Sequence, residues 1–158
     1  MHLRRLLPVF ATSIFAASAY AGADRFGVTF VPGGTARAQV EKSPESEGLA
    51  LIDYARNASH SVLLVRRTKP GHAEVHTGIT DVWYVIDGSG TLVTGGKPIE
   101  AKPVAAGELR GRGVSDGISH HIGKGDIIDI PAGVPHWVSG IDGKELVYLT
   151  VKVVTPTR

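Results

Sequence analysis

The stretch Gly125–His136, with the sequence GDIIDIPAGVPH, decides the fold of this chain. Its first half mixes Ile and Asp as a strand with one solvated face does, and a short turn follows. Pro131 and Pro135 fix the backbone φ angle and lack an N–H donor, so neither suits the middle of a sheet. Gly133, between them, suits a backbone conformation that other residues avoid. The turn therefore delivers His136 onto the next strand in a fixed orientation, as a ligand would be delivered.

In the rest of the chain, Gly, Pro, Asp and Ser separate short apolar runs, which is typical of an all-β protein. The runs that we expect to be strands are Val28–Val31, Val62–Arg66, Ala73–His76, Val82–Ile86, Thr91–Thr94, Ile118–Ile122, Asp126–Ile130, Trp137–Ser139 and Glu145–Val154. Short strands with regular turns predict a sandwich, a jelly roll or a small barrel. In the last run, one face is thoroughly apolar. Val147, Leu149, Val151 and Val153 alternate there with Leu146, Tyr148, Thr150 and Lys152.

Three segments between these runs carry further expectations. Ser43-Pro44-Glu45 is typical of a helix start, and Leu49, Ile52 and Ala55 would form its buried stripe. Gly88-Ser89-Gly90 reads as a hairpin turn between strands. Gly95–Gly117 reads as a long irregular loop. It either folds over the barrel mouth, bringing Arg110 or Arg112 to an anionic substrate, or is a solvated excursion.

Upstream of the turn, several polar side chains are placed to share one face. Residues two apart on a strand point the same way, which here groups His72, Glu74 and His76. A four-residue hairpin loop at Thr77–Thr80 would set Asp81 opposite His76, and Trp83 would continue that face as an aromatic wall. We therefore expect Glu74, His76 and Asp81 to converge.

Two imidazoles with one or two carboxylates form a recognisable set of metal ligands. Neutral imidazole suits Zn, Cu, Fe and Ni, carboxylates favour harder ions, and two His with one carboxylate suit non-haem Fe(II). If only one of Glu74 and Asp81 coordinates, the other is left to act as a general base or to hold a metal-bound water. His72 is expected to line the mouth of the site, and Trp83 to border its cavity or fill the core. The adjacent pair His120-His121 faces opposite ways on a strand and is expected at the surface.

The spacing of these residues resembles the two signature motifs of the cupin family. Gly125, five residues, Pro131-Ala132-Gly133, two residues and His136 match the second motif closely. The first motif is His-x-His, three or four residues, Glu, six residues, Gly. Its frame fits Glu74-Val75-His76, then Asp81, then Gly88, with Glu74 in place of the first His and Asp81 in place of the Glu. The resemblance covers roughly residues 70–138.

The resemblance implies a cupin-type double-stranded β-helix, which is a jelly-roll barrel, with at most one short helix before it. Residues 61–154 would form the barrel, and residues 22–60 a strand or short helix packed on it. It also implies a divalent metal (Fe, Mn, Zn or Ni) held by Glu74, His76, Asp81 and His136, with Asp81 as the catalytic candidate and His72 and Trp83 in the substrate pocket. Such proteins are commonly homodimers.

Two functions follow from that resemblance. The first is a small metalloenzyme acting on a low-molecular-weight metabolite as an oxygenase, lyase or isomerase. The alternative is a non-catalytic binding module that captures a small ligand or the metal itself. The fold does not choose between them.

The N-terminus is typical of a secretory signal peptide. Met1–Arg5 is basic, Leu6–Ala19 is apolar, and Ala19-Tyr20-Ala21 fits the small-x-small cleavage rule. We expect residues 1–21 to be removed and the protein to be periplasmic. Without Arg4 and Arg5 the 17 basic residues fall to 15, which equals the 15 acidic residues. This balance argues against nucleic-acid or membrane partners, and the lack of Cys leaves only N and O metal ligands.

If this assignment is correct, the exported protein begins at Gly22. The intact mass of protein purified from the periplasm should be lower by the mass of Met1–Ala21. A full-length mass would remove the periplasmic assignment.

Overall fold

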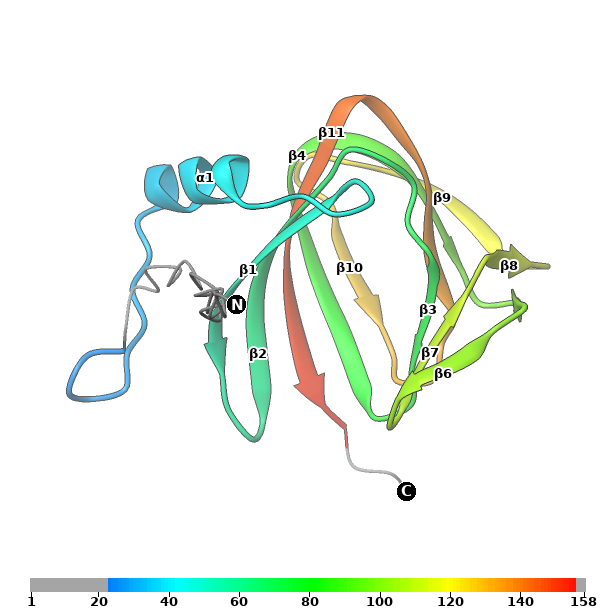
Figure 1. Ribbon diagram of the computed structural model, residues 1–158, viewed down its shortest axis with the longest axis horizontal. Coiled ribbons are helices and arrows are strands. Elements are labelled where there is room, and N and C mark those ends of the chain that lie inside the picture. Colours follow the sequence, from blue (N-terminus) through cyan, green and yellow to red (C-terminus); the bar gives the residue numbers. More distant parts are fainter. Residues whose placement is uncertain (1–22, 156–158) are drawn as a thin grey trace, which may run out of the picture.

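The structure is a computed structural model that describes residues 23–155, so the expected leader lies outside the described residues (Figure 1). The described elements are, in chain order, α1 (Gly33–Lys42), β1 (Leu49–Arg56), β2 (His60–Arg67), β3 (Ala73–His76), β4 (Ile79–Thr94), β5 (Lys97–Ile99), β6 (Lys102–Ala105), β7 (Glu108–Gly111), β8 (Gly113–Ser115), β9 (Ile118–Gly123), β10 (Ile127–Ile130) and β11 (His136–Val154). In this part of the chain, no helix has the length and apolar character needed to cross a membrane.

Two long antiparallel strands, β4 and β11, organise the sheet. They pair from Ile79 opposite Val154 to Thr94 opposite His136, with register shifts along the way. The first half of β4 and the second half of β11 join β10 on one side and β2 and β1 on the other. The other two halves join β9 on one side and β3, β7 and β6 on the other. The sheet curls into a barrel, which confirms the expected jelly-roll fold (Figure 1).

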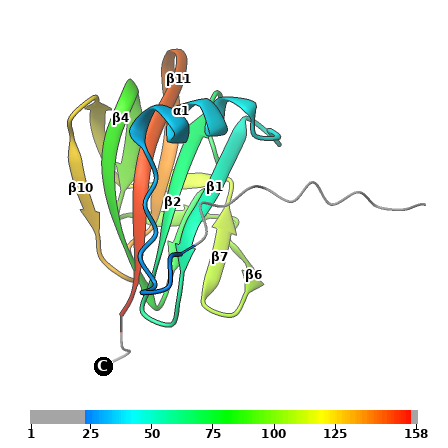
Figure 2. The same ribbon diagram turned by 90° about the vertical axis from the view of Figure 1, so that its left-hand side faces the viewer.

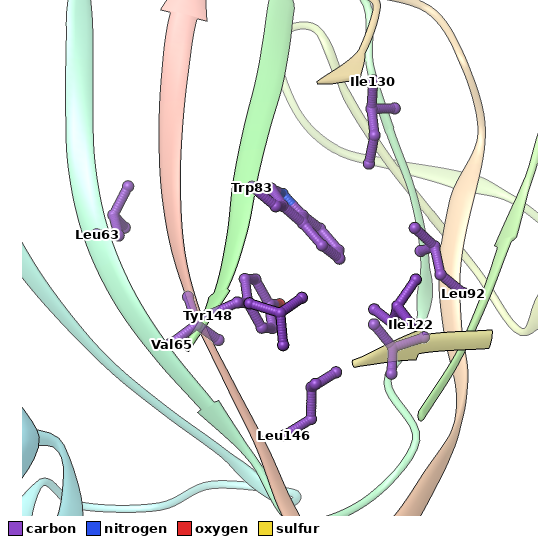
Figure 3. Packing of buried hydrophobic residues seen from close by; sticks show 10 residues of the cluster. Leu63, Val65, Trp83, Leu92, Ile122, Ile130, Leu146 and Tyr148 are labelled. Carbon is purple, nitrogen blue, oxygen red and sulfur yellow. The ribbon is translucent and has the colours of Figure 1, made fainter. Parts of the chain in front are cut away.

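The barrel interior holds the main apolar core. It is built from alternate residues of the long strands and their neighbours, because successive side chains point to opposite faces of a sheet. Its buried members are Leu63, Val65, Trp83, Val85, Leu92, Ile122, Ile130, Val138, Leu146 and Tyr148. Figure 3 shows Trp83 and Tyr148 side by side in this core, with their rings stacked at a centroid distance of 4.3 Å. These two rings border the polar part of the interior.

Helix α1 lies outside the barrel, across the strands β1, β2 and β11 (Figure 2). It is anchored by Val40, which packs with Ile52 of β1 and Val147 of β11, and by an ion pair between Arg37 and Glu145. The face of β11 that carries Val147 therefore points outward, under the helix. The opposite face, with Leu146 and Tyr148, points into the barrel.

The prediction of a helix that begins at Ser43 is wrong. The chain is helical over the preceding residues, Gly33–Lys42, and Pro44 follows the C-cap residue Ser43, so the helix cannot readily continue. Residues 49–56 form strand β1 instead, with Ala50, Ile52 and Tyr54 buried at the two-residue period of a strand. The strand expected at Val28–Val31 is also absent: these described residues join no β-ladder. The sheet thus begins at Leu49.

Other boundaries differ because strands run through expected turns. Gly88-Ser89-Gly90 is no hairpin but the bend of β4, where Gly88 has a φ of +76°. The runs Trp137–Ser139 and Glu145–Val154 are likewise one strand, β11. The expected loop Gly95–Gly117 contains the four short strands β5 to β8. Strand β5 pairs with β8, β6 pairs with β7, and β7 also pairs with β3. The local sequence does not reveal these pairings.

Substitution of Leu92 tests the assignment of the core. Its side chain is 0% exposed, whereas Leu51 is 48% exposed. Leu92→Ala should lower the free energy of unfolding by about 3 kcal/mol, since it leaves a cavity among packed neighbours. Leu51→Ala should cost less than about 1 kcal/mol. Urea unfolding measures both, and equal losses would contradict the assigned core.

Candidate metal centre

His136 enters the barrel from the turn that the sequence singled out. Gly133 has a φ of +82°, and the N–H of Val134 donates to the carbonyl of Pro131 at 3.1 Å, which closes the turn. The N–H of Gly133 donates to the carbonyl of His76 at 2.8 Å and ties the turn to β3. The turn thus fixes the backbone position from which the His136 side chain projects.

The hydrogen bonds of His136 leave one nitrogen free. Nδ1 donates to the carbonyl of Val134 at 3.1 Å, so the neutral ring carries its lone pair on Nε2. Nε2 is buried and has no hydrogen-bond partner among residues 23–155. Burial lowers the pKa of His136, although the nearby carboxylates Glu74 and Asp81 oppose the shift. A neutral imidazole with a buried, unpartnered lone pair results.

His76 is oriented in the same way by a different partner. Its Nδ1 lies 2.6 Å from Oε2 of Glu108, which stands opposite it on β7. Because a carboxylate accepts, Nδ1 donates, and Nε2 carries the lone pair. A histidine whose second nitrogen donates to a carboxylate is the usual arrangement of a metal ligand.

Two carboxylates bring further lone pairs to the same point. Oε2 of Glu74 lies 3.3 Å from Nε2 of His76 and 4.0 Å from Nε2 of His136. Oδ2 of Asp81 lies 3.6 Å and 3.7 Å from the same two nitrogens. Burial alone would raise the pKa of Glu74, but the guanidinium groups of Arg110 and Arg67 hold that pKa below its ordinary value. Glu74 is therefore ionised.

Lys152 supplies a cation where these groups meet. Its Nζ donates to both oxygens of Asp81, at 2.7 and 2.8 Å, and to Nε2 of His76 at 2.9 Å. Lys152 stands directly opposite Asp81 in the pairing of β11 with β4. Since an ammonium group only donates, these contacts agree with the lone pair assigned to Nε2 of His76.

A cavity of about 130 Å³ opens beside this cluster. Its wall includes the aromatic pair Trp83 and Tyr148, and three cationic side chains, Arg67, Arg110 and Lys152. Nε of Arg67 donates to the hydroxyl of Tyr148 at 3.0 Å, and Nη2 donates to Glu74 at 3.3 Å. Trp83 also meets the ring of His136 edge to face, at 5.9 Å between centroids. The cavity combines an apolar wall with fixed positive charge.

The structure brings most of the expected residues together, but by a different route. Strands β3 and β4 do not form the expected hairpin: β3 pairs with β7 and β11, and the turn at Thr77-Gly78 joins β3 to β4 without pairing them. Asp81 and His76 therefore meet without standing opposite each other on paired strands, with Oδ2 of Asp81 3.6 Å from Nε2 of His76. Trp83 borders the cavity as expected.

His72 lies apart from the cluster. It is exposed, with Nε2 at 3.4 Å from Glu47, and lines a neighbouring cavity of about 220 Å³ that shares Arg67, Glu74 and Arg110 with the first. His120 and His121 are both exposed on β9, as expected. Arg112 is exposed beside Glu100, whereas Arg110 lines the cavity.

Sequence reasoning missed Lys152, Arg67 and Glu108. Lys152 shares the inward face of β11 with Leu146 and Tyr148, and Arg67 continues the inward face of Leu63 and Val65 on β2. Two-residue alternation from these core residues was the available signal for both. Glu108 had no such signal, because its place depends on the pairing of β7 with β3.

The fold and the site together describe a small jelly-roll barrel protein, with two histidines and convergent carboxylates in its interior. The chain matches the family profile described as Cupin over residues 53–156, and it belongs to the cupin family. No curated protein matches it.

Solved structures share the fold at low sequence identity. Streptomyces PAC13 with uridine is 15% identical, with a TM-score of 0.51, and the match covers 75% of this chain and 82% of that one. A protein from Klebsiella pneumoniae with a double-stranded β-helix domain is 18% identical, with a TM-score of 0.51 and coverage of 75% and 88%. CapF with a tropolone inhibitor is 12% identical, with a TM-score of 0.52, and the match covers 71% of this chain but only 30% of CapF. These likenesses establish the fold.

The residues present fit the divalent metal that cupins typically bind. Ligand atoms of Glu74, His76 and His136 all lie within 4.8 Å of one another. Donors about 2.0–2.2 Å from one ion lie about 3–4 Å apart, which is close to the distances between these atoms. Neither nitrogen needs to lose a proton, because hydrogen bonds already place both lone pairs on the inner atoms.

His136→Ala should remove most bound divalent metal and leave a folded barrel. The substitution deletes one of the candidate ligands, whereas the core depends on the apolar side chains around it. Elemental analysis of the purified variant measures metal content, with His120→Ala at the exposed surface as the matched control. Unchanged metal content in His136→Ala would show that the metal binds elsewhere.

Proposed function

We propose that this protein is a metal-dependent enzyme of the cupin family that acts on a small, negatively charged metabolite. The observation that carries the proposal is the convergence of lone pairs from His76, His136 and Glu74 on one buried point. The ammonium group of Lys152 meets only the lone pair of His76, and Nε2 of His136 has no partner among the described residues, so a further cation is favoured at this point. Glu74, His76 and His136 would hold the metal, which makes a set of two histidines and one carboxylate.

The charge around the cavity supports an anionic substrate. Arg67, Arg110 and Lys152 line the cavity with two carboxylates, Glu74 and Asp81, so the positive side chains are in excess. A divalent ion would add two more positive charges. Guanidinium groups suit the planar, two-point recognition of a carboxylate. The cavity of about 130 Å³ restricts the ligand to a small molecule.

Asp81 is the group best placed to move a proton. It is 2% exposed and faces both histidine nitrogens at less than 4 Å, yet Lys152 holds both of its oxygens. Asp81 and Lys152 together form an acid–base pair beside the metal ligands. A bound divalent ion would supply Lewis-acid polarisation of a substrate oxygen. The reaction fits an oxygenase, lyase or isomerase.

The structures of two relatives agree with a small ligand. PAC13 is described as a nucleoside dehydratase and was crystallised with uridine, and CapF was crystallised with a tropolone inhibitor. The shared fold therefore supports a small-molecule ligand for this chain.

One observation favours the alternative, a non-catalytic binding module. Glu74, Asp81 and Glu108 are each paired with a cationic side chain, so the polar centre is stable with its own charges alone. Such a centre also serves to capture an anion without converting it. Export to the periplasm and pairing into a homodimer are part of the proposal for either function.

The decisive experiment is turnover by metal-loaded protein. The purified chain, loaded separately with Fe, Mn, Zn or Ni, is incubated with a mixture of small carboxylic acids, and each acid is followed by mass spectrometry. Conversion that needs both the metal and His136 supports the enzyme. Binding of an acid without conversion, measured by calorimetry under the same conditions, supports the binding module.

Neutral substitutions of Glu74 and Asp81 should have different effects on metal occupancy and turnover. Glu74→Gln should lower metal occupancy, because the guanidinium-paired Glu74 groups with the two histidines. Asp81→Asn should leave most of the metal in place and impair turnover, because Lys152 already holds that carboxylate. Elemental analysis and the turnover assay separate the two effects. Equal loss of metal from both variants would make Asp81 a direct ligand.

A further inference from the structure

We propose that Lys152 withholds Asp81 from the metal and thereby keeps the centre at three protein ligands. The proposal rests on the metal-binding part of the proposed function. It concerns which carboxylates of this chain reach the ion, and it gives a role to a lysine in the middle of a candidate metal site.

Asp81 is otherwise well placed to bind the metal. Its side chain is 2% exposed, and Oδ2 lies 3.6 Å from Nε2 of His76 and 3.7 Å from Nε2 of His136. A buried carboxylate at these distances from two ligand nitrogens would be drawn to a divalent ion. Its carboxylate is nevertheless not among the three groups, Glu74, His76 and His136, whose ligand atoms all lie within 4.8 Å of one another.

Lys152 accounts for that difference. Its ammonium group has three N–H donors, and the structure gives it three acceptors: the two oxygens of Asp81 and Nε2 of His76. Both oxygens of Asp81 are therefore engaged. The pairing is built into the sheet, because Asp81 on β4 and Lys152 on β11 are directly opposite each other.

The three hydrogen bonds of Lys152 have different fates when a metal binds. The lone pair of His76 serves either Lys152 or the ion, so that hydrogen bond is lost. The two bonds to Asp81 persist, since they use oxygens that the three-ligand centre does not need. The ammonium group then stays close to the ion and weakens its binding by like-charge repulsion. Lys152 thus trades metal affinity for open coordination positions, which a substrate requires.

Removal of Lys152 should therefore tighten metal binding. In Lys152→Met the charge is gone and Asp81 is free to become a fourth ligand. We expect the Kd for Co²⁺ or Zn²⁺, measured by competition with a chelator, to fall by at least about tenfold. The visible absorption of bound Co²⁺ should also change, because the spectrum reports the number and type of ligands.

Variants of Asp81 distinguish two causes of tighter metal binding: the loss of repulsion by Lys152, and the release of Asp81 to become a ligand. Asp81→Asn alone should change the Kd by less than about tenfold, since Asp81 is not a ligand while Lys152 is present. Lys152→Met with Asp81→Asn should lose most of the gain seen in Lys152→Met, and its Co²⁺ spectrum should return toward that of the wild type. Lys124→Met, at an exposed turn residue, is the matched control and should bind as the wild type does.

The outcomes are distinguishable. Wild-type protein that binds no metal would overturn the metal-binding part of the proposed function and this inference with it. Wild-type protein that binds metal, with Lys152→Met equal or weaker and its Co²⁺ spectrum unchanged, would overturn this inference alone. Lys152→Gln, which is neutral and keeps hydrogen-bond donors, provides a second variant. If neither variant folds by circular dichroism, Lys152 serves the stability of the barrel, and the inference is overturned as well.

Discussion

The pairing of β4 with β11 is the interaction on which the barrel and its polar centre both depend. These strands run antiparallel through both halves of the barrel, so each contributes residues to the apolar core and to the candidate site. The same register that stacks Trp83 on Tyr148 also sets Asp81 opposite Lys152. A slip of one residue would turn all of these side chains to the outer face, because the side-chain period of a strand is two.

Buried charge is the second constraint on this structure. A carboxylate inside a barrel is costly unless a cation or several donors meet it. Here the partner often stands directly across a strand pair: Glu74 faces Arg110, His76 faces Glu108, and Asp81 faces Lys152. The partners are not passive, because Glu108 selects the tautomer of His76 and Lys152 occupies both oxygens of Asp81. The counter-charges thus determine which lone pairs remain available to a metal.

Local signals predicted much of this structure. The turn before His136 is as expected, with Gly133 at positive φ, because two prolines and a glycine restrict the backbone wherever they occur. Ala73–His76 is a strand with the predicted bounds. The helix was misplaced because Ser43-Pro44 ends α1 rather than beginning it, and the same residue types serve at both ends of helices. Residues 49–56 show the two-residue period of burial of a strand, and the helical stripe predicted there does not form.

The sequence by itself determined the class of the fold, the orientation of His136 and the grouping of Glu74 with His76, since all of these follow from alternation and turn chemistry within a few residues. Only the tertiary structure decided the environment of these groups. The expected β3–β4 hairpin does not form, and Glu108 and Lys152 reach the site because their strands pair with β3 and β4, so that they contact residues 32 and 71 positions away. Sheet pairing over such separations is selected by how the whole chain buries its apolar faces, and short sequence patterns carry no record of that choice.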